Sequence, residues 1–496
     1  MISYTWIPYF TGVVAFLMAY GIGANDVANA FATSVGAKAI TLNQALIIAS
    51  VMEFSGAFLM GSHVTDTVAK GIIDPNAFID TPEILMVANM CALLAAAVWL
   101  LLATNWNMPV STTHSIIGAL IGCGLVAGKA NAIKWSKVIE IVVSWFTSPV
   151  LSGLFTFLLF LFVRNCILRK TNSFERALKF FPYLVAFTFA MNIFFIIYKG
   201  SPQLGLDKTP FWLACVVALS IGCIIGVLLY FFMVPCLRRR SMKVETPAPI
   251  PAPVPASAAE VKIDDNSDKT ESLTTVPDTT IEVPVEAPKK EHNFLNQDVH
   301  AELRDEESQV YKIHQHAEKF DPRTESVFSF VQVVTATFDS FCHGANDVAN
   351  SIGPFAGVIS IYLHKGIESK SEVPVWILAL GGAGIVVGLA TLGYKIMASI
   401  GVNLVRVTPS RGFTIEMGAA IVVLLGSRLS LPLSTTHCQV GSTVGVGLLE
   451  GKGGINWKLF IEVFAGWILT MVVSAALAAG LFFFAMGTPS MLVPFK

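Results

Sequence analysis

"GANDVANAFATSVG", residues 23–36, places two amide side chains and an aspartate in one of the most apolar regions of the chain. The seven letters GANDVAN return at residues 344–350, again behind an apolar run. An ionisable side chain inside a membrane is costly and is a functional candidate by default. Asp26 and Asp347 are therefore the first candidates for a binding site.

The composition predicts an all-α polytopic membrane protein. The chain has 496 residues, of which 54% are hydrophobic and 14% are charged, whereas about a quarter are charged in soluble domains. Several apolar runs reach the length of about 20 residues that a membrane-spanning helix needs. The net charge of −1 argues against a nucleic-acid partner.

Hydropathy predicts about twelve crossings in two groups. They are expected near residues 7–22, 43–61, 86–104, 109–127, 137–163, 181–198 and 211–237, then 326–342, 374–398, 412–430, 433–449 and 457–486. Residues 238–325 are rich in Pro, Ala and charge, so we predict a disordered linker, with a short polar helix in its later part. The chain thus divides into residues 1–237, 238–325 and 326–496.

Basic residues predict the orientation. Lys and Arg cluster at residues 164–179 and 238–243, and short basic loops usually face the cytoplasm. Counting crossings from there places both termini outside and the linker in the cytoplasm, and we expect the membrane to be the plasma membrane. The two GANDVAN copies then enter from opposite faces. This predicts an inverted-topology repeat with its site near the midplane.

A second motif is also doubled. "MPVSTTHSIIGALIG" spans residues 108–122 and "LPLSTTHCQVGSTVG" spans residues 431–445. A Ser or Thr after the Pro is expected to cap a helix. A helix that begins inside the membrane exposes unpaired N–H groups, which form an anion site. Hydroxyl groups add donors suited to phosphate or sulfate: Ser111, Thr112, Thr113, Ser434, Thr435 and Thr436.

The GANDVAN copies suggest a cation site, because amide and carboxylate oxygens suit alkali and alkaline-earth ions. The candidate ligands are Asn25, Asp26, Asn29, Asn346, Asp347 and Asn350. Gly36 and Gly353, the latter followed by Pro354, predict broken or re-entrant helices whose free carbonyls join the coordination. Glu53 and Glu416 also lie in apolar runs, either as buried acids at a helix interface or as cation ligands or gates.

Charge balance links the two sites. The four motif segments contain no Lys or Arg, so an anion bound there faces aspartates with no fixed cation. Bound Na⁺ or protons would offset this repulsion, which makes anion binding depend on cation binding and predicts symport. His114 and His437 are either structural donors to backbone carbonyls or members of a proton relay.

Two other functions fit the motifs less well. An intramembrane hydrolase would use Ser111, His114 and Asp26, but it needs one set of residues and the motifs are doubled. A divalent-metal transporter is disfavoured by the hydroxyl groups and by the absence of His pairs at metal spacing. We therefore expect no enzymatic activity and no resident cofactor.

With both motifs doubled, residues 7–237 and 326–490 resemble the PiT family of inorganic phosphate transporters. The resemblance implies a sodium- or proton-coupled phosphate symporter with inverted repeats, extracellular termini and a large cytoplasmic loop. It places phosphate among Asp26, Ser111, Thr112, Thr113, Asp347, Ser434, Thr435 and Thr436. It assigns Na⁺ binding or gating to Asn25, Asn29, Asn346, Asn350, Glu53 and Glu416 together with the two aspartates.

Two details qualify this interpretation. The linker and the intact pair of Glu53 and Glu416 favour sodium, with proton coupling as the alternative. The second copy continues "SIGPFAG" where the first reads "AFATSVG", so the two ends of the site need not be equivalent. The oligomeric state stays open, with a homodimer as a candidate.

Overall fold

The computed structural model describes residues 4–62, 65, 71–198, 205–206, 208–244, 299–367, 373–428 and 433–487. These residues form helices and one isolated bridge between Ile73 and Ile133, with no strand among them. The chain is therefore all-helical in its described part, as the composition predicts. Most of the predicted linker, namely residues 245–298, lies outside the described residues.

The helices of the first part of the chain are α1 (Trp6–Gly36), α2 (Leu42–Met60), η1 (Pro75–Phe78), α4 (Pro82–Asn105), α5 (Thr112–Val126), η2 (Ala130–Ala132), α6 (Trp135–Val163), η3 (Arg164–Leu168), α7 (Ser173–Ile197), α8 (Phe211–Leu228), η5 (Leu229–Met233) and α9 (Val234–Ser241). Those of the second part are η7 (Ala301–Arg304), α10 (Gln309–His316), α11 (Pro322–His364), α12 (Val375–Leu392), α13 (Tyr394–Gly401), α14 (Pro409–Arg428), α15 (Thr435–Leu449), η8 (Lys452–Gly454) and α16 (Trp457–Gly487).

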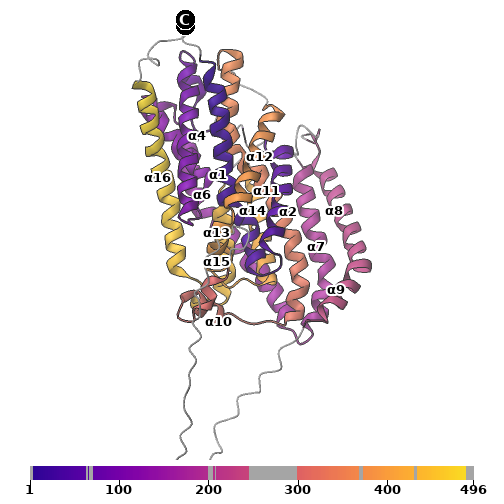
Figure 1. The fold of residues 1–496 in the computed structure, drawn as a ribbon. Coiled ribbons are helices and arrows are strands. Elements are labelled where there is room, and N and C mark those ends of the chain that lie inside the picture. The colour runs from indigo at the N-terminus through magenta and orange to yellow at the C-terminus, as the bar shows by residue number, and fades with distance from the viewer. Residues whose placement is uncertain are drawn as a thin grey trace, which may run out of the picture.

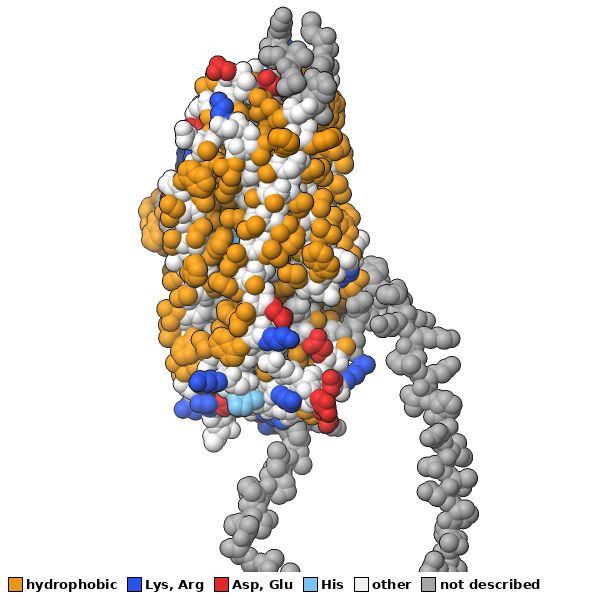
Figure 2. All heavy atoms as spheres, turned by 90° about the vertical axis from the view of Figure 1, so that its left-hand side faces the viewer, with side chains coloured by type: hydrophobic (Ala, Val, Ile, Leu, Met, Phe, Trp, Pro, Cys, Tyr) orange, Lys and Arg blue, Asp and Glu red, His pale blue; other side chains and the backbone are white. Residues whose placement is uncertain are grey.

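Eight of the described helical segments are long and apolar enough to cross a membrane. They are Trp6–Gly36, Leu42–Met60, Pro82–Asn105, Trp135–Leu168, Ser173–Ile197, Phe211–Ser241, Val375–Leu392 and Trp457–Gly487. Figure 2 shows hydrophobic side chains over most of the height of the molecule and charged side chains gathered toward its ends. This surface is suited to a bilayer.

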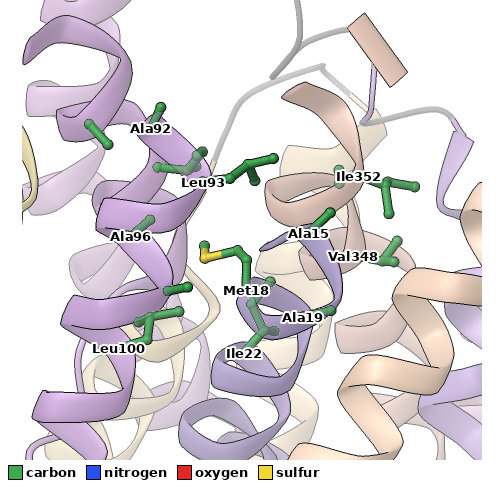
Figure 3. Packing of buried hydrophobic residues seen from close by; sticks show 14 of the residues in the cluster. Ala15, Met18, Ala19, Ile22, Ala92, Leu93, Ala96, Leu100, Val348 and Ile352 are labelled. Carbon is green, nitrogen blue, oxygen red and sulfur yellow. The ribbon is translucent and has the colours of Figure 1, made fainter. Parts of the chain in front are cut away.

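The centre of the molecule is built around α1 and α11, which carry the two GANDVAN copies. Helix α1 packs against α4, α11 and α12 (Figure 1). Met18 and Ile22 of α1 meet Leu93 and Leu100 of α4, with Val348 of α11 close by (Figure 3). These side chains form a dry apolar layer on one side of the first motif.

The helices α1 and α11 run in opposite directions past each other. A side-chain carbon at Gly12, before the first motif, would touch Phe355, after the second. On the other side of the motifs, Thr33 of α1 and Thr335 of α11 both bond to Glu416. The two copies of the motif therefore lie side by side, with their flanking residues in opposite order.

The first glycine of each motif lets another helix come close. A Cβ atom at Gly23 would lie 2.0 Å from the backbone oxygen of Ile385 in α12. A Cβ atom at Gly344 would lie 2.1 Å from the backbone oxygen of Glu53 in α2. Such approaches need glycine, because any side chain would overlap the neighbouring backbone.

The helix breaks differ from the prediction. Helix α1 ends at Gly36, as expected, but α11 continues through Gly353 and Pro354 to His364. The helices that follow the STTH motifs, α5 and α15, are short instead: each has 15 residues, and they begin at Thr112 and Thr435. The motif residues themselves are small and buried, so neighbouring helices support the backbone that Gly and Pro would otherwise weaken.

Residues 299–321 belong to the predicted linker; they include α10 and dock onto the end of the molecule where α9 lies (Figure 1). We call them the docked segment and this end the linker end. His300 lies 3.0 Å from the Gly36 carbonyl oxygen, and His316 lies 3.1 Å from that of Glu450. The docked segment thus covers the ends of α1 and α15.

Candidate functional site

The two serine caps confirm the capping prediction for both STTH motifs. The Ser111 hydroxyl accepts a hydrogen bond from the His114 N–H at 3.2 Å, and Ser434 accepts one from the His437 N–H at 3.3 Å. Both serines have extended backbone angles, which start α5 and α15 at the following threonine. Each helix therefore presents its N-terminal N–H groups inside the protein.

Each aspartate bonds to the first threonine of its own copy. Thr112 donates to Asp26 Oδ2 at 2.9 Å, and Thr435 donates to Asp347 Oδ2 at 3.1 Å. Both carboxylates are buried. The structure thus brings each GANDVAN to its STTH, although 86 and 88 residues separate these bonded pairs in the chain.

The asparagines join each copy to the other. Asn29 of the first copy donates to Thr436 at 3.0 Å, and Asn350 of the second donates to Thr113 at 3.1 Å. Thr436 also lies 3.4 Å from Asp26 Oδ1. The eight residues expected around phosphate therefore gather with Asn29 and Asn350 in one buried cluster, which we call the doubled site. The eight are Asp26, Ser111, Thr112, Thr113, Asp347, Ser434, Thr435 and Thr436.

Asn25 and Asn346 have different positions. The Asn25 amide donates to the Met108 carbonyl and accepts from the Val110 N–H, both at 3.0 Å, so it holds the chain that leads into α5. Asn346 donates to Asp347 Oδ1 at 2.9 Å. By contrast, the side-chain oxygen of Asn29 is buried and has no hydrogen-bond partner among the described residues.

The histidines of the two motifs meet behind the helix starts. Their rings lie 4.6 Å apart in an edge-to-face arrangement, and each also packs on a tryptophan, His114 on Trp145 and His437 on Trp467. None of the four ring nitrogens of the two histidines has a hydrogen-bond partner among the described residues. The predicted bond from His to a backbone carbonyl is absent there.

The two glutamates lie in unlike surroundings. Glu416 of α14 accepts hydrogen bonds from Thr33, Ser34, Gln332 and Thr335, at 2.6, 2.9, 3.1 and 2.5 Å. Glu53 of α2 is also buried, but its Oε1 has no hydrogen-bond partner among the described residues. Glu416 thus sits in a cluster of hydrogen-bond donors, whereas Glu53 Oε1 does not.

Six polar residues of this region were not predicted: Thr33, Ser34, Gln332, Thr335, Asp339 and His343. Thr33 and Ser34 belong to the "AFATSVG" tail that distinguishes the first copy. On α11 the signal is a spacing of four residues from Thr335 through Asp339 and His343 to Asp347. Residues four apart lie on one helix face, so this pattern marks a buried polar stripe.

The chemistry of the doubled site fits an anion that is accompanied by cations. The hydroxyl groups and helix N-termini donate hydrogen bonds, whereas the two carboxylates repel an anion. The hydrogen bonds that the carboxylates accept come from hydroxyl and amide groups rather than from Lys or Arg. A buried carboxylate pair needs balancing cations or protons.

Comparisons with known proteins relate the chain to phosphate transporters. A model of the phosphate transporter family matches residues 22–478. A putative phosphate permease of Pyrococcus horikoshii is 34% identical, over 95% of this chain and 96% of that protein. The sodium-dependent phosphate transporter 1 of mouse is 28% identical, over 96% of this chain and 95% of its own.

A fungal relative and a solved structure add to this picture. A phosphate-repressible phosphate permease of Neurospora crassa is 30% identical, over 94% of this chain and 95% of that protein. A solved structure described as a sodium-dependent phosphate transporter superposes with a TM-score of 0.75 at 32% identity, covering 97% of this chain and 98% of the other.

Proposed function

Because the chain belongs to the phosphate transporter family, which is not a family of enzymes, we propose that it is a symporter that carries inorganic phosphate together with Na⁺. Sodium dependence is named for the mouse relative and for the solved structure. Proton coupling is the alternative, since the permease relatives carry no such name.

The observation that carries the proposal is the pair of buried aspartates beside two helix N-termini. Phosphate would bind between α5 and α15, with the hydroxyl groups of Thr112, Thr113, Thr435 and Thr436 as donors. Asp26 and Asp347 would hold Na⁺ next to it, with the free amide oxygen of Asn29 as a further ligand. The cation offsets the repulsion between phosphate and carboxylate, so the two bind together.

The same contacts support an inverted repeat of residues 1–237 and 326–496, linked by a cytoplasmic segment. Helices α1 and α11 run in opposite directions, and the cross-copy bonds of Asn29 and Asn350 support a position of the doubled site where the two halves meet. Basic clusters at the linker end favour a cytoplasmic position for it, with both termini extracellular in the plasma membrane. Rocking of the halves would then expose the site alternately to each side.

The test is uptake of radiolabelled phosphate into proteoliposomes that contain the full chain, with an inward Na⁺ gradient or an inward H⁺ gradient imposed separately. We expect the Na⁺ gradient alone to drive accumulation, and empty liposomes serve as the control. Accumulation under the H⁺ gradient only would replace Na⁺ by protons in the mechanism. Phosphate movement under neither gradient would refute the proposed function.

A further inference from the structure

Asp339 and His343 form a buried polar pair that the doubled site does not use. Both side chains are at most 1% exposed, and Asp339 Oδ1 lies 3.6 Å from His343 Nε2. Neither carboxylate oxygen of Asp339 and neither ring nitrogen of His343 has a hydrogen-bond partner among the described residues. Four unsatisfied polar atoms in one buried place point to something that binds there.

The pair exists only in the second copy. Asp339 lies eight residues before Asp347 and His343 lies four before it. The residues that precede Asp26 at these distances are Met18 and Ile22, which pack in the apolar layer of Figure 3. Apolar side chains fill the equivalent positions of the first copy, so helix packing at these positions does not require polar groups. Packing therefore does not explain the Asp339–His343 pair.

The surroundings of the pair are acidic. Asp339 interacts electrostatically with Glu416 of α14 and Asp347 of α11, and also with Glu53 of α2. The Cys438 thiol of α15 is the other titratable neighbour. On the α7 side, Asn192 is neutral and bonds to Cys342. The charged groups that influence Asp339 are thus carboxylates, and no Lys or Arg among the described residues contributes to its surroundings.

A charged Asp339 would be expensive in this place, because a buried carboxylate without donors loses its hydration and gains nothing in return. One proton resolves the problem. Bound on Asp339 Oδ1, it neutralises the carboxylate and can be donated as O–H···N toward His343 Nε2, which engages one polar atom of each residue. An alkali cation is a poorer match, since a ring nitrogen is not a hard oxygen ligand.

We propose that Asp339 and His343 form a proton-binding site that only the second half of the transporter possesses. It lies on α11 between Asp347 of the doubled site and Thr335, which bonds Glu416. A proton there reduces the negative charge that phosphate meets, so proton binding and phosphate binding favour each other. The inference rests on the proposed function for this linkage, whereas the existence of the site is independent of it.

The decisive variant is Asp339→Met/His343→Ile, which gives the second copy the residues of the first. The matched control is Met18→Leu/Ile22→Leu, which changes the equivalent positions without adding or removing a titratable group. Single variants Asp339→Asn and His343→Gln keep the shape of the pair if the double variant does not fold.

Infrared difference spectra of the full chain in nanodiscs, recorded between high and low pH in potassium salt, detect carboxyl protonation without any substrate. We expect a protonated-carboxyl signal in the parent and in the Met18→Leu/Ile22→Leu control that is lost in Asp339→Met/His343→Ile and Asp339→Asn. An identical signal in all of them would overturn the proposal. A signal displaced by Na⁺ at constant pH would also overturn it, by showing a sodium site.

Calorimetry of phosphate binding in two buffers of different ionisation enthalpy tests the linkage, with saturating NaCl. Since each chain receives the same phosphate, the difference between variants reports on the protein. We expect Asp339→Met/His343→Ile to take up about one proton fewer per phosphate than the parent. Equal proton counts would refute the linkage. If the parent bound no phosphate, the proposed function would fail while the infrared result still decided the site.

Discussion

The two GANDVAN copies are identical in letters, yet the helices that carry them approach the site differently. In α1 the residues before the motif, such as Met18 and Ile22, are apolar and fully packed (Figure 3). In α11 the corresponding positions are Asp339 and His343. Since the helices run in opposite directions, these approaches lie on opposite sides of the doubled site.

The residues after the motif differ in the complementary way. Thr33 and Ser34 follow the first copy and bond Glu416, whereas Pro354 and Phe355 follow the second. Polar groups thus gather on the linker side of the doubled site and apolar groups on the other side. The two copies share the same contacts inside the doubled site. The residues that flank the site are polar on the linker side and apolar on the opposite side.

The largest effect is expected from removing either carboxylate. In Asp26→Asn or Asp347→Asn the balancing charge for Na⁺ is lost, and a charged contact of about 3 kcal/mol corresponds to a loss on the order of 100-fold in phosphate uptake. Uptake into proteoliposomes under an Na⁺ gradient measures this, with the variant Asp80→Asn at an exposed position as control. If one aspartate proved dispensable, the copies would not share one binding geometry.

Much of this comparison could be predicted from the sequence. The two doubled motifs, through the family resemblance they carry, predicted that Asp26 and Asp347 would share one site with the STTH hydroxyl groups. The structure brings Asp26 to Thr112 and Asp347 to Thr435. Serine capping of both short helices was predicted for the same local reason: a hydroxyl followed by a helix start.

Other features depend on tertiary contacts that one sequence does not contain. The continuation of α11 through Pro354 was not predicted, because Gly and Pro weaken an isolated helix while packing restores it. The four donors around Glu416 come from α1 and α11, far apart in the chain, so no local pattern marks them. The polar stripe of α11 was visible as a four-residue spacing, but only the contrast with α1 gives it meaning.

A smaller effect is expected from the bonds between copies. Asn29→Ala and Asn350→Ala each remove hydrogen bonds to threonines of the opposite copy, at about 1 kcal/mol. Each should therefore weaken phosphate binding roughly five- to tenfold, measured as uptake at subsaturating phosphate. Asn192→Ala is the matched control, because this buried amide bonds Thr188 of α7 and Cys342 of α11 but no threonine of either STTH copy. Strongly unequal effects of the two variants would mean that the ends of the doubled site have separate roles.

The smallest effect concerns the docked segment, which bonds the ends of α1 and α15 together at the linker end. His314 Nε2–H donates to the Val402 carbonyl at 2.9 Å, and the pKa of His314 is lowered, chiefly by burial. A detached histidine gains a proton near pH 6.5, whereas the docked one resists it. The docked state therefore loses stability as the pH falls below about 6.5.

Hydrogen exchange of residues 299–321 at pH 7.5 and 5.5 measures this loss. We expect exchange to be on the order of threefold faster at the lower pH than the intrinsic rate explains, and His314→Gln to remove the difference, because a neutral amide donates to Val402 at both pH values. His364→Gln, on α11 outside the docked segment, should leave it intact. Persistence of the difference in His314→Gln would assign the pH dependence to His300 or His316, and with it to the ends of α1 or α15.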